Sequence, residues 1–586
     1  MAFWVDETIN EILKRKDKKY LITDYKTPSG KIHVGALRGV IIHDVIYKGL
    51  LESGKKSEFI YGFDDMDPMD DVPSELAKEF SKYMGQPLCN IPSPDCKASS
   101  YAQFFAKEFK SVYKKLGVKS KTVWASQLYK SGKYDKAIKI ILDSADKIRQ
   151  IYFDVSGGKK PDNWYPLSVI CPKCGKIGTT RVFDWDGKEV SFVCEPNLVK
   201  WAQGCGYQGK ISPFSGNAKL PYKVETPSKW YSFGTSVELA GKDHYTKGGS
   251  FDIARRIAQE VFKIRPVYGY GYEWFLVGGK KMSTSKGVGS FATEIADILP
   301  SELLRFLMVR TRAKRTIDFD PYGTTILDLY DEYDRCIDAF LDDPKSDQAR
   351  AYYFTKLFAH STNAQGVLSS TPPIRIILRA SRVYGGTRSL RLEESTSKDE
   401  VSASLVASQG GRPPQYRMRF VKVAYLLQMA RVNIDEYASE EKQGELTVEE
   451  ENDLKIRREY ARRWLDFYAP DNYKFKIQKE LPEVAKSLSS KQIEFLHKIA
   501  DLLEYEDTTD KEEYQKIAEL IDHKILKGEK LHSGIHNLKK EMNLDAKLAF
   551  SAIYLSLIGK DSGPQAGWLI ASLDKDFVIK RFRSLP

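Results

Sequence analysis

One stretch near the start of the chain constrains the fold more than any other. Tyr20 to Thr23 is a short apolar run typical of a buried strand, and a turn containing Pro and Gly at 27–30 leads from it to His33 and Gly35. An apolar-rich segment with helical spacing, Leu37 to Ile46, follows directly. A strand, a glycine-containing turn and a helix form the first half of a nucleotide-binding βαβ unit, whose helix N-terminus can face phosphate. The stretch therefore predicts an α/β domain built on a Rossmann-type, doubly wound parallel sheet.

Later segments extend this pattern. Strands are predicted at Phe59 to Tyr61, at Thr122 to Ala125 and at Val267 to Tyr272, and one long helix is predicted from Tyr134 to Phe153. An acidic run at 64–71 comes just after the first of these strands. Acidic residues at the carboxyl edge of a parallel sheet can bind a cationic substrate or hydrated Mg²⁺, and a solvated acidic turn is the competing interpretation.

A second unusual stretch lies at Gly278 to Gly287, where glycines, three lysines and three hydroxyl residues fall close together. Glycines allow the backbone to approach a ligand closely, lysines supply mobile positive charge, and hydroxyls supply short hydrogen bonds. Such a loop suits a polyphosphate whose charge shifts during a reaction. Taken alone, it is also compatible with an ordinary solvated loop.

Four of the seven cysteines follow a metal-binding pattern. Cys171 and Cys174 form a Cys-x-x-Cys-Gly knuckle, and Cys194 and Cys205 follow, with β-like residues before them. Four thiolates satisfy tetrahedral Zn²⁺, so a structural zinc site is predicted, with inert thiols as the alternative. The odd number of unevenly spaced cysteines indicates a reducing compartment. Because no signal peptide or membrane span is recognisable either, we expect a cytoplasmic protein without a membrane partner.

The second half of the chain differs in composition from the first. From about Lys356 to Gly411, Ser, Thr and Arg rise while Lys nearly disappears, so a disordered insertion is expected at 351–411, whether native or foreign to the protein. Helical spacing in segments such as Val448 to Phe467 predicts an all-α domain at 412–586. The formal net charge of +12 fits a polyanionic partner without specifying one.

The two glycine-containing motifs occur together in one family. A His-x-Gly turn after the first strand, paired with a Lys-Met-Ser-x-Ser loop, resembles the class I aminoacyl-tRNA synthetases, and their neighbours are similar to the class I lysyl-tRNA synthetases of archaea and some bacteria. The resemblance covers roughly residues 1–350 and 412–586. The sequences that carry it are Thr27-Pro-Ser-Gly-x-x-His33, Asp64-Asp65-x-Asp67-Pro68, Gly241-Lys-Asp-His-x-x-x-Gly-Gly-Ser250 and Lys281-Met-Ser-x-Ser-Lys286-Gly.

The resemblance implies a two-step reaction. The carboxylate of L-lysine attacks the α-phosphate of Mg²⁺-borne ATP, giving lysyl-adenylate and pyrophosphate, and the lysyl group then passes to the terminal ribose of tRNA(Lys). This chemistry needs positioning and charge neutralisation more than covalent help. The catalytic residues implied are His33, Lys281 and Lys286. The ATP-binding residues implied are Thr27, Ser29, Gly30, His33, Gly35, Lys281, Met282, Ser283, Ser285 and Lys286.

Selection of lysine needs an acceptor-rich, partly aromatic pocket around an ammonium. The family positions for this pocket correspond to Thr27, Tyr222, His244 and Tyr272. Further acceptors that the sequence does not rank are Asp24, Asp65 and Glu225.

The chain departs from the family pattern at four positions. Ala36 stands where the motif commonly has His or Asn, and Thr284 stands where lysine is common, so Lys281 and Lys286 are expected to supply the charge of the loop. The other two departures are Tyr222 in place of Trp and Tyr25 in place of Gly.

The resemblance also implies a division of the chain. A catalytic domain is expected at 1–300, with an inserted helical and zinc-knuckle region at about 85–220, followed by a helical stem-contact region at 301–350 and an anticodon-binding domain at 412–586. A monomer or weak oligomer is expected. The competing interpretations are a class I synthetase for another amino acid, such as glutamate, and a catalytically silent tRNA-binding paralogue.

Overall fold

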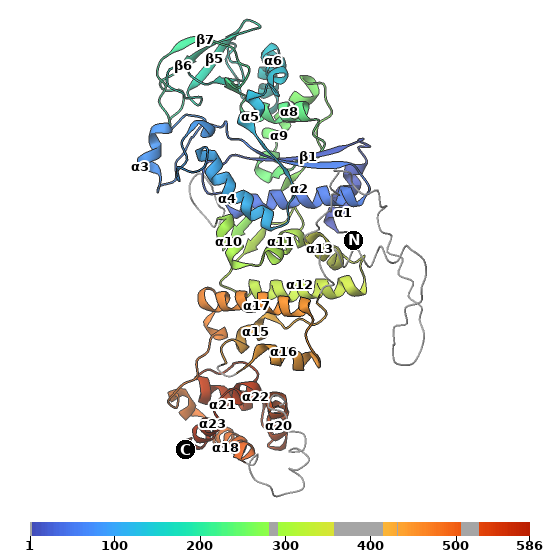
Figure 1. The fold of residues 1–586 in the computed structure, drawn as a ribbon, viewed down its shortest axis with the longest axis vertical. Helices are drawn as coiled ribbons and strands as arrows, with labels where there is room; N and C mark the ends of the chain where they lie inside the picture. Colours follow the sequence, from blue (N-terminus) through green and yellow to red (C-terminus); the bar gives the residue numbers. More distant parts are fainter. Residues whose placement is uncertain (1–2, 280–290, 357–413, 430–431, 505–526, 586) are drawn as a thin grey trace, which may run out of the picture. The chain divides into compact units, whose positions relative to one another are not determined.

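The computed structural model describes residues 3–279, 291–356, 414–429, 432–504 and 527–585 (Figure 1). The chain divides into two compact units. Unit 1 comprises Met1–Asp320 and Arg335–Gly410, and unit 2 comprises Pro321–Asp334 and Gly411–Pro586. The sequence predicts a disordered insertion at 351–411, and residues 357–411 of it lie outside the described ranges.

A parallel sheet forms the centre of unit 1. β1 (Tyr20–Lys26) pairs in parallel with β2 (Ser57–Phe63), and β2 pairs in parallel with β3 (Lys121–Trp124). On the other side of β1, Val237 forms parallel bridges both to β1 and to Tyr268. The order β3, β2, β1, Val237, Tyr268 changes direction at β1, as in a doubly wound sheet. The prediction of a parallel sheet is therefore confirmed.

Helix α2 (Val34–Glu52) begins directly after His33 and lies along one face of this sheet (Figure 1). Most of its residues are buried, which explains why its sequence is rich in apolar residues around the whole helix. The buried Arg38 guanidinium donates a 2.7 Å hydrogen bond to the carbonyl of Trp274, and it donates others to the chain near residue 313. These bonds hold the segment after Tyr272 against the first half of the helix.

The chain between β3 and Val237 forms helices and a small antiparallel sheet. The single helix predicted from Tyr134 to Phe153 is wrong, because the structure has two helices, α6 (Asp135–Asp143) and α7 (Ala145–Ser156). Ser144 separates them with φ −112° and ψ 22°, a non-helical conformation that serine favours at helix ends. The antiparallel sheet consists of β5 (Thr180–Trp185), β6 (Val190–Cys194) and β7 (Gln208–Ile211).

The remaining elements of unit 1 support this frame. Helix α13 contains residues 351–355, which the sequence placed in the insertion, and Tyr352 and Phe354 of this helix are buried. The elements are α1 (Trp4–Leu13), α3 (Ala77–Phe80), α4 (Tyr101–Lys115), α5 (Ala125–Lys130), β4 (Ser168–Val169), β8 (Ala218–Lys219), α8 (Tyr222–Phe233), β9 (Ala240–Gly241), α9 (Ser250–Glu260), β10 (Gly271–Tyr272), β11 (Phe275–Val277), α10 (Ala292–Ile298), α11 (Ser301–Arg310), β12 (Ile317–Phe319) and α13 (Asp347–Thr355), with 3₁₀ turns at Ser81–Tyr83, Leu88–Asn90 and Lys242–Tyr245.

Within its described residues, unit 2 contains helices and no strands. Its core gathers apolar side chains such as Phe495, Leu557 and Phe582, and a buried Arg457 pairs with Asp334 and Asp453. Helix α12 (Thr325–Asp342) contributes to both units. The other helices are α15 (Phe420–Leu426), α16 (Ile434–Lys442), α17 (Val448–Phe467), α18 (Ser490–Glu504), α20 (Lys527–Glu541), α21 (Ala546–Ile558), α22 (Ala566–Ala571) and α23 (Lys575–Arg583), with 3₁₀ turns at Asp471–Tyr473 and Glu483–Ser487. Across the described ranges of both units, no helix combines the length and the apolar character needed to cross a membrane.

Candidate active site

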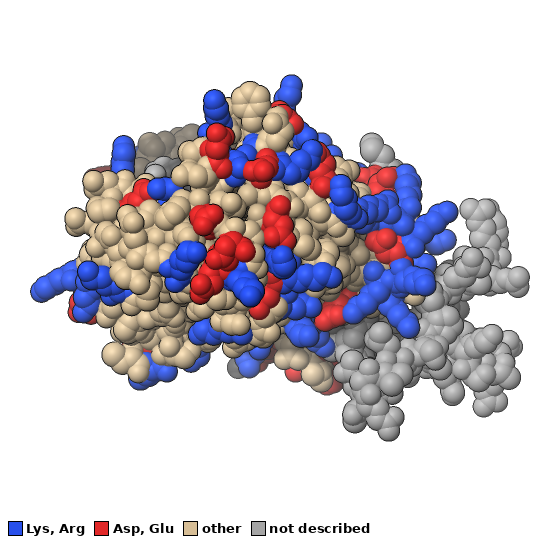
Figure 2. Space-filling view, turned by 90° about the horizontal axis from the view of Figure 1, so that it is seen from above, with Lys and Arg blue, Asp and Glu red and all other residues tan. Residues whose placement is uncertain are grey.

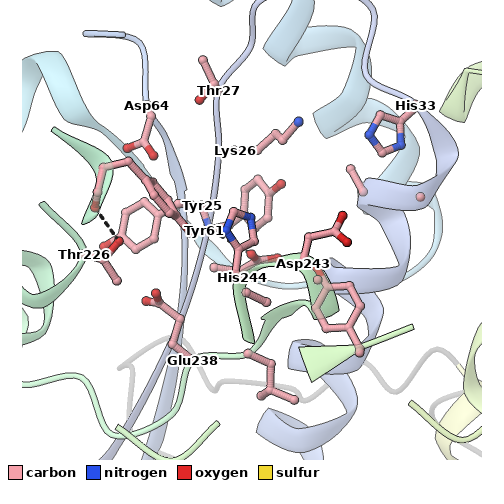
Figure 3. Close-up of a pocket in the computed structure, with 18 of the residues that line it drawn as sticks. Tyr25, Lys26, Thr27, His33, Tyr61, Asp64, Thr226, Glu238, Asp243 and His244 are labelled. Carbon is pink, nitrogen blue, oxygen red and sulfur yellow. Dashed lines mark hydrogen bonds between the residues drawn. The ribbon is translucent and has the colours of Figure 1, made fainter. Parts of the chain in front are cut away.

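A cavity of about 510 Å³ opens at the carboxyl ends of β1 and of the segment that follows Val237 (Figure 3). The strand order changes direction here, and ligands of doubly wound sheets bind in the crevice at such a point. The cavity is lined by Asp24, Tyr25, Lys26, Thr27, His33, Gly35, Ala36, Tyr61, Asp64, Asp67, Tyr222, Thr226, Lys229, Glu238, Leu239, Ala240, Gly241, Asp243, His244, Tyr272, Glu273, Trp274 and Phe275.

Three carboxylates on one side of the cavity are paired with two lysines of the protein. Lys229 donates to Asp64 at 2.6 Å and lies 3.2 Å from Glu225, and Lys219 lies 2.8 Å from Asp67 and 3.0 Å from Glu225. Burial would raise the pKa of Glu225, but the attraction of Lys219 and Lys229 outweighs burial and lowers this pKa to about 2. Each of these three carboxylates is therefore already paired with a lysine of the protein.

Two other carboxylates, Asp24 and Glu238, have no lysine or arginine within ion-pair distance in the described part of the chain. Asp24 accepts the amide of Tyr25 at 2.9 Å, and Glu238 accepts the hydroxyl of Thr23 at 2.5 Å. Burial is the largest influence on both groups and raises the pKa of each to about 7. A cationic ligand would offset this burial, so Asp24 and Glu238 are the acceptors chemically suited to an ammonium.

A neutral histidine fixes the backbone beside Glu238. The Nε2 atom of His43 accepts the amide of Leu239 at 2.9 Å, so its Nδ1 donates to the carbonyl of Gly39 at 2.7 Å. Burial lowers the pKa of His43 to about 4. The ring is therefore uncharged at neutral pH, and its 3.5 Å approach to Asp24 is not an ion pair.

Aromatic rings form much of the cavity wall. The rings of Tyr222 and His244 lie 5.2 Å apart, and the Nζ atom of Lys229 lies 3.9 Å from the ring centroid of Tyr25. A Cβ atom on Gly62 would fall 2.1 Å from the Tyr25 ring, so only glycine at position 62 leaves room for that ring. Such walls can hold an aliphatic stem and the cation at its end.

His33 lines the opposite part of the cavity, at the N-terminus of α2. A Cβ atom on Gly35 would come within 2.9 Å of the His33 imidazole, so this glycine keeps space for the ring. The unpaired amides of the first helical turn and the helix dipole favour an anion at this end. The His-x-Gly motif thus combines an imidazole with a helix start that favours an anion.

The structure brings together most of the predicted site residues that it describes. Asp65 does not line the cavity, because its carboxylate accepts the Ser126 hydroxyl at 2.6 Å and the Ser126 amide at 2.7 Å. Ser29 and Gly30 lie in the turn before α2 and are not among the lining residues. The predicted residues that do line the cavity are Asp24, Thr27, His33, Gly35, Tyr222, His244 and Tyr272. The predicted residues that lie outside the described ranges are Lys281, Met282, Ser283, Ser285 and Lys286.

Sequence reasoning did not assign several charged residues of the lining to the site, among them Asp64, Glu238, Lys229 and Lys26. Asp64 is the first residue after β2 and belongs to the acidic run, but nothing in the run distinguished it from Asp65. Glu238 follows the buried Val237, so a polar residue just past a strand was the available signal. Lys229 stands four residues after Glu225 in α8, a spacing that places both on one helix face. Lys26 ends β1 and carried no signal of its own.

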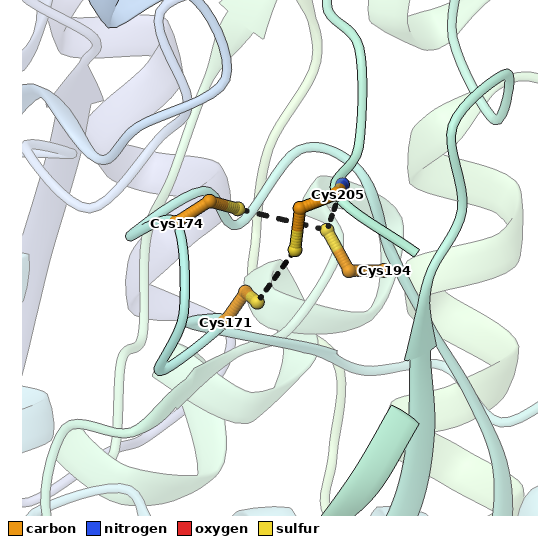
Figure 4. A group of neighbouring side chains, drawn as sticks. All are labelled: Cys171, Cys174, Cys194 and Cys205. Atoms are coloured by element: carbon orange, nitrogen blue, oxygen red, sulfur yellow. Dashed lines mark hydrogen bonds between the residues drawn. The ribbon is translucent and has the colours of Figure 1, made fainter. Parts of the chain in front are cut away.

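The four predicted metal ligands lie together in the region of the antiparallel sheet (Figure 4). The Sγ atoms of Cys171 and Cys205 are 3.6 Å apart, those of Cys174 and Cys194 are 3.7 Å apart, and all four lie within 4.8 Å of one another. A Zn–S bond of about 2.3 Å in a tetrahedral site gives sulfur separations of about 3.8 Å. The geometry of the four thiols therefore fits Zn²⁺.

Comparisons with known proteins identify the family of this chain. The sequence matches the family described as tRNA synthetases class I (K) over residues 2–359. A lysine–tRNA ligase of Methanosarcina barkeri is 32% identical over 99% of this chain and 97% of that protein, and one of Methanocaldococcus jannaschii is 32% identical over 99% of each. The alignment with a solved glutamate tRNA ligase of Elizabethkingia meningosepticum covers 97% of this chain and 99% of that chain, at 11% identity and a TM-score of 0.38.

The family match and the curated relatives point to the same family. The family match spans more than half of the chain, and the curated relatives align with nearly its whole length. This chain belongs to the class I (K) family of tRNA synthetases.

Proposed function

We propose that this protein ligates L-lysine to tRNA(Lys). Lysine and ATP give lysyl-adenylate and pyrophosphate, and transfer of the lysyl group to tRNA releases AMP. The observation that carries this proposal is the full-length similarity to lysine–tRNA ligases at about 30% identity. The chemistry of the cavity supports it, because two buried carboxylates lie beside aromatic rings in a site that also has an anion-favouring helix start.

The amino acid is proposed to bind on the Tyr222 and His244 side of the cavity. Its ammonium would be held by Asp24 and Glu238, while its aliphatic stem packs on Tyr222, His244 and Tyr272. Binding would remove much of the electrostatic penalty that burial imposes on the two carboxylates. A glutamate side chain would meet two like charges in the same place, which argues against the glutamate-specific alternative.

ATP is proposed to bind on the His33 side, with its phosphates facing the N-terminus of α2 and Mg²⁺ bound to the phosphates. Thr27 is held in place by a 2.5 Å hydrogen bond from its hydroxyl to Asp67. Lys281 and Lys286 are proposed to neutralise the departing pyrophosphate, as the family resemblance implies. In this arrangement the lysine carboxylate meets the α-phosphate between the two halves of the cavity.

Unit 2 is proposed to bind the anticodon arm of tRNA, with the helical region at 301–350 contacting the stem. A shallow, open hollow in this unit has His532, His536, Phe550 and Lys547 among its lining residues. The rings of His536 and Phe550 lie 4.9 Å apart, and such rings can stack on unpaired bases. On the face seen in Figure 2, which looks from above the view of Figure 1, Lys and Arg side chains are spread among carboxylates, so charge alone marks no tRNA contact on that face.

Zn²⁺ is proposed to be structural, held by Cys171, Cys174, Cys194 and Cys205. The ion would cross-link the knuckle to β6 and to the turn before β7, and four protein ligands would leave no open position for catalysis. The thiol cluster is separate from the residues that line the active-site cavity.

The proposed function is tested by amino-acid-dependent exchange of labelled pyrophosphate into ATP. Lysine should support exchange, and glutamate at the same concentration should not. Exchange with glutamate alone would contradict the proposed substrate. Binding of tRNA without exchange by any amino acid would favour the silent paralogue.

A further inference from the structure

Lys26, the last residue of β1, extends into the cavity between its two halves (Figure 3). Its backbone is fixed, because it pairs with Phe63 of β2 and its carbonyl accepts the amide of Asp64 at 3.0 Å. In Figure 3 the side chain points toward the side of the cavity where His33 lies. Burial lowers the pKa of His244, and the positive charge of Lys26 lowers it further. Lys26 is therefore also close to His244, on the side of the cavity proposed to bind the amino acid.

The ammonium of Lys26 differs from those of the other lysines in this site. Lys219 and Lys229 each pair with two carboxylates, whereas Lys26 has no ion pair within 4.0 Å and no side-chain hydrogen bond among the residues that the structure describes. The carboxylates of Asp24, Asp67 and Asp64 attract it from farther away, but burial still lowers the pKa of Lys26.

Two of the three carboxylates near Lys26 are engaged with other side chains, and the third, Asp24, is the proposed acceptor for the substrate ammonium. Asp64 pairs with Lys229, and Asp67 accepts from Thr27 and pairs with Lys219. A buried cation without a close counter-charge is stabilised by an anionic ligand. Lys26 lies between His33 and His244. In the proposed reaction the α-phosphate lies there too, between the polyphosphate side and the amino-acid side.

We propose that Lys26 is a catalytic residue that binds the non-bridging oxygens of the α-phosphate of ATP. The inference rests on the proposed function, which places lysine on the His244 side and the polyphosphate on the His33 side. In the step, a carboxylate oxygen of lysine forms a bond to the α-phosphorus. The bond from this phosphorus to the bridging oxygen breaks, and pyrophosphate leaves with the electron pair. Lys26 stays protonated and offsets the charge on the α-phosphate oxygens during the displacement.

The test compares AMP with adenosine, which differ only in the phosphate. Calorimetric titration of full-length Lys26→Met should show AMP binding weakened about 10- to 100-fold, the usual worth of a hydrogen bond to a charged group. Adenosine binding should not change. In pyrophosphate exchange, kcat should fall about 100-fold while the KM for lysine changes little. Lys26→Arg should recover part of the preference for AMP.

The matched control is Lys55→Met, which removes an exposed lysine just before β2, at the amino-terminal edge of the sheet. It should leave both titrations and the exchange rate unchanged. Equal losses of AMP and adenosine affinity in Lys26→Met would overturn the proposal. So would a selective loss of lysine relative to lysinol, because Lys26 would then bind the amino-acid carboxylate. If the wild type shows no lysine-dependent exchange, the proposed function fails, while the comparison of AMP with adenosine still decides the role of Lys26.

Discussion

Replacement of Glu238 by glutamine should stabilise the unliganded protein and abolish tight binding of lysine. Glu238 is 7% exposed, and burial raises its pKa from 4.5 to about 7. Each pKa unit corresponds to about 1.4 kcal/mol, so holding this carboxylate ionised in the folded state costs about 3 kcal/mol. Glutamine has nearly the same shape and can still accept the hydroxyl of Thr23, but it carries no charge to bury.

The pH dependence follows from the direction of the shift. Because the folded-state pKa lies above the unfolded value, the folded protein binds more protons between about pH 4.5 and 7, and Glu238 lowers stability progressively across that window. The free energy of unfolding of Glu238→Gln should exceed that of the wild type by about 2.5 kcal/mol more at pH 8 than at pH 5. Lysine affinity of the wild type should rise over the same interval, because only the ionised carboxylate attracts the ammonium.

The assay is unfolding of both proteins at pH 5 and pH 8, with and without lysine, together with calorimetric titration of lysine. Lysine should raise the unfolding midpoint of the wild type and leave that of Glu238→Gln nearly unchanged. The matched control is Glu273→Gln, since Glu273 lines the same cavity but lies 2.6 Å from Lys242. This change should give no stabilisation at pH 8. A Glu238→Gln protein that is no more stable at pH 8 than the wild type, or that still binds lysine tightly, would refute the reasoning.

Three other substitutions test the geometry. Gly35→Ala should lower kcat in pyrophosphate exchange about 10- to 100-fold by displacing the His33 ring, with the unfolding midpoint nearly unchanged, and a wild-type rate would contradict the crowding seen there. Gly62→Ala should weaken lysine binding because the new Cβ collides with the Tyr25 ring, and adding Tyr25→Ala should restore it; failure of this rescue would exclude the collision as the cause. Cys194→Ser should lower the zinc content measured by atomic absorption and the unfolding temperature, whereas an unchanged zinc content would argue against the four-thiol site.

The parallel sheet could be predicted because its signals are local. The run from Tyr20 to the start of α2 carries strand, turn and helix in one continuous sequence, and the structure follows it closely. The break at Ser144 was missed, because the apolar spacing of α6 and α7 continues across it and one serine does not interrupt the pattern. The sequence therefore predicted which helices and strands form better than it predicted where they begin and end.

The candidate site was predictable only in part, for a different reason. Tyr222, His244 and Tyr272 stand at positions that the family uses for the amino acid, so resemblance could point to them even though Tyr222 replaces the usual Trp. Which acid is available to a ligand depends on which carboxylates are already paired, and most of those partners are distant in sequence. Asp65 accepts from Ser126, and Glu225 is paired with Lys219 and Lys229. Because the sequence does not show which residues contact one another, it cannot distinguish a carboxylate that is already paired from one that is available to a ligand.

The lysines buried beside this cavity have a consequence for selectivity. A lysine-binding site with several carboxylates nearby needs most of them occupied, because a free carboxylate could bind the substrate ammonium in an unproductive position. Lys219 and Lys229 do this by keeping Asp64, Asp67 and Glu225 engaged. In the proposed function, these lysines of the protein occupy the carboxylates that could otherwise bind the substrate ammonium, so the substrate has one binding position. Replacing Lys219 or Lys229 would free a carboxylate and create a second, unproductive binding position for the same amino acid.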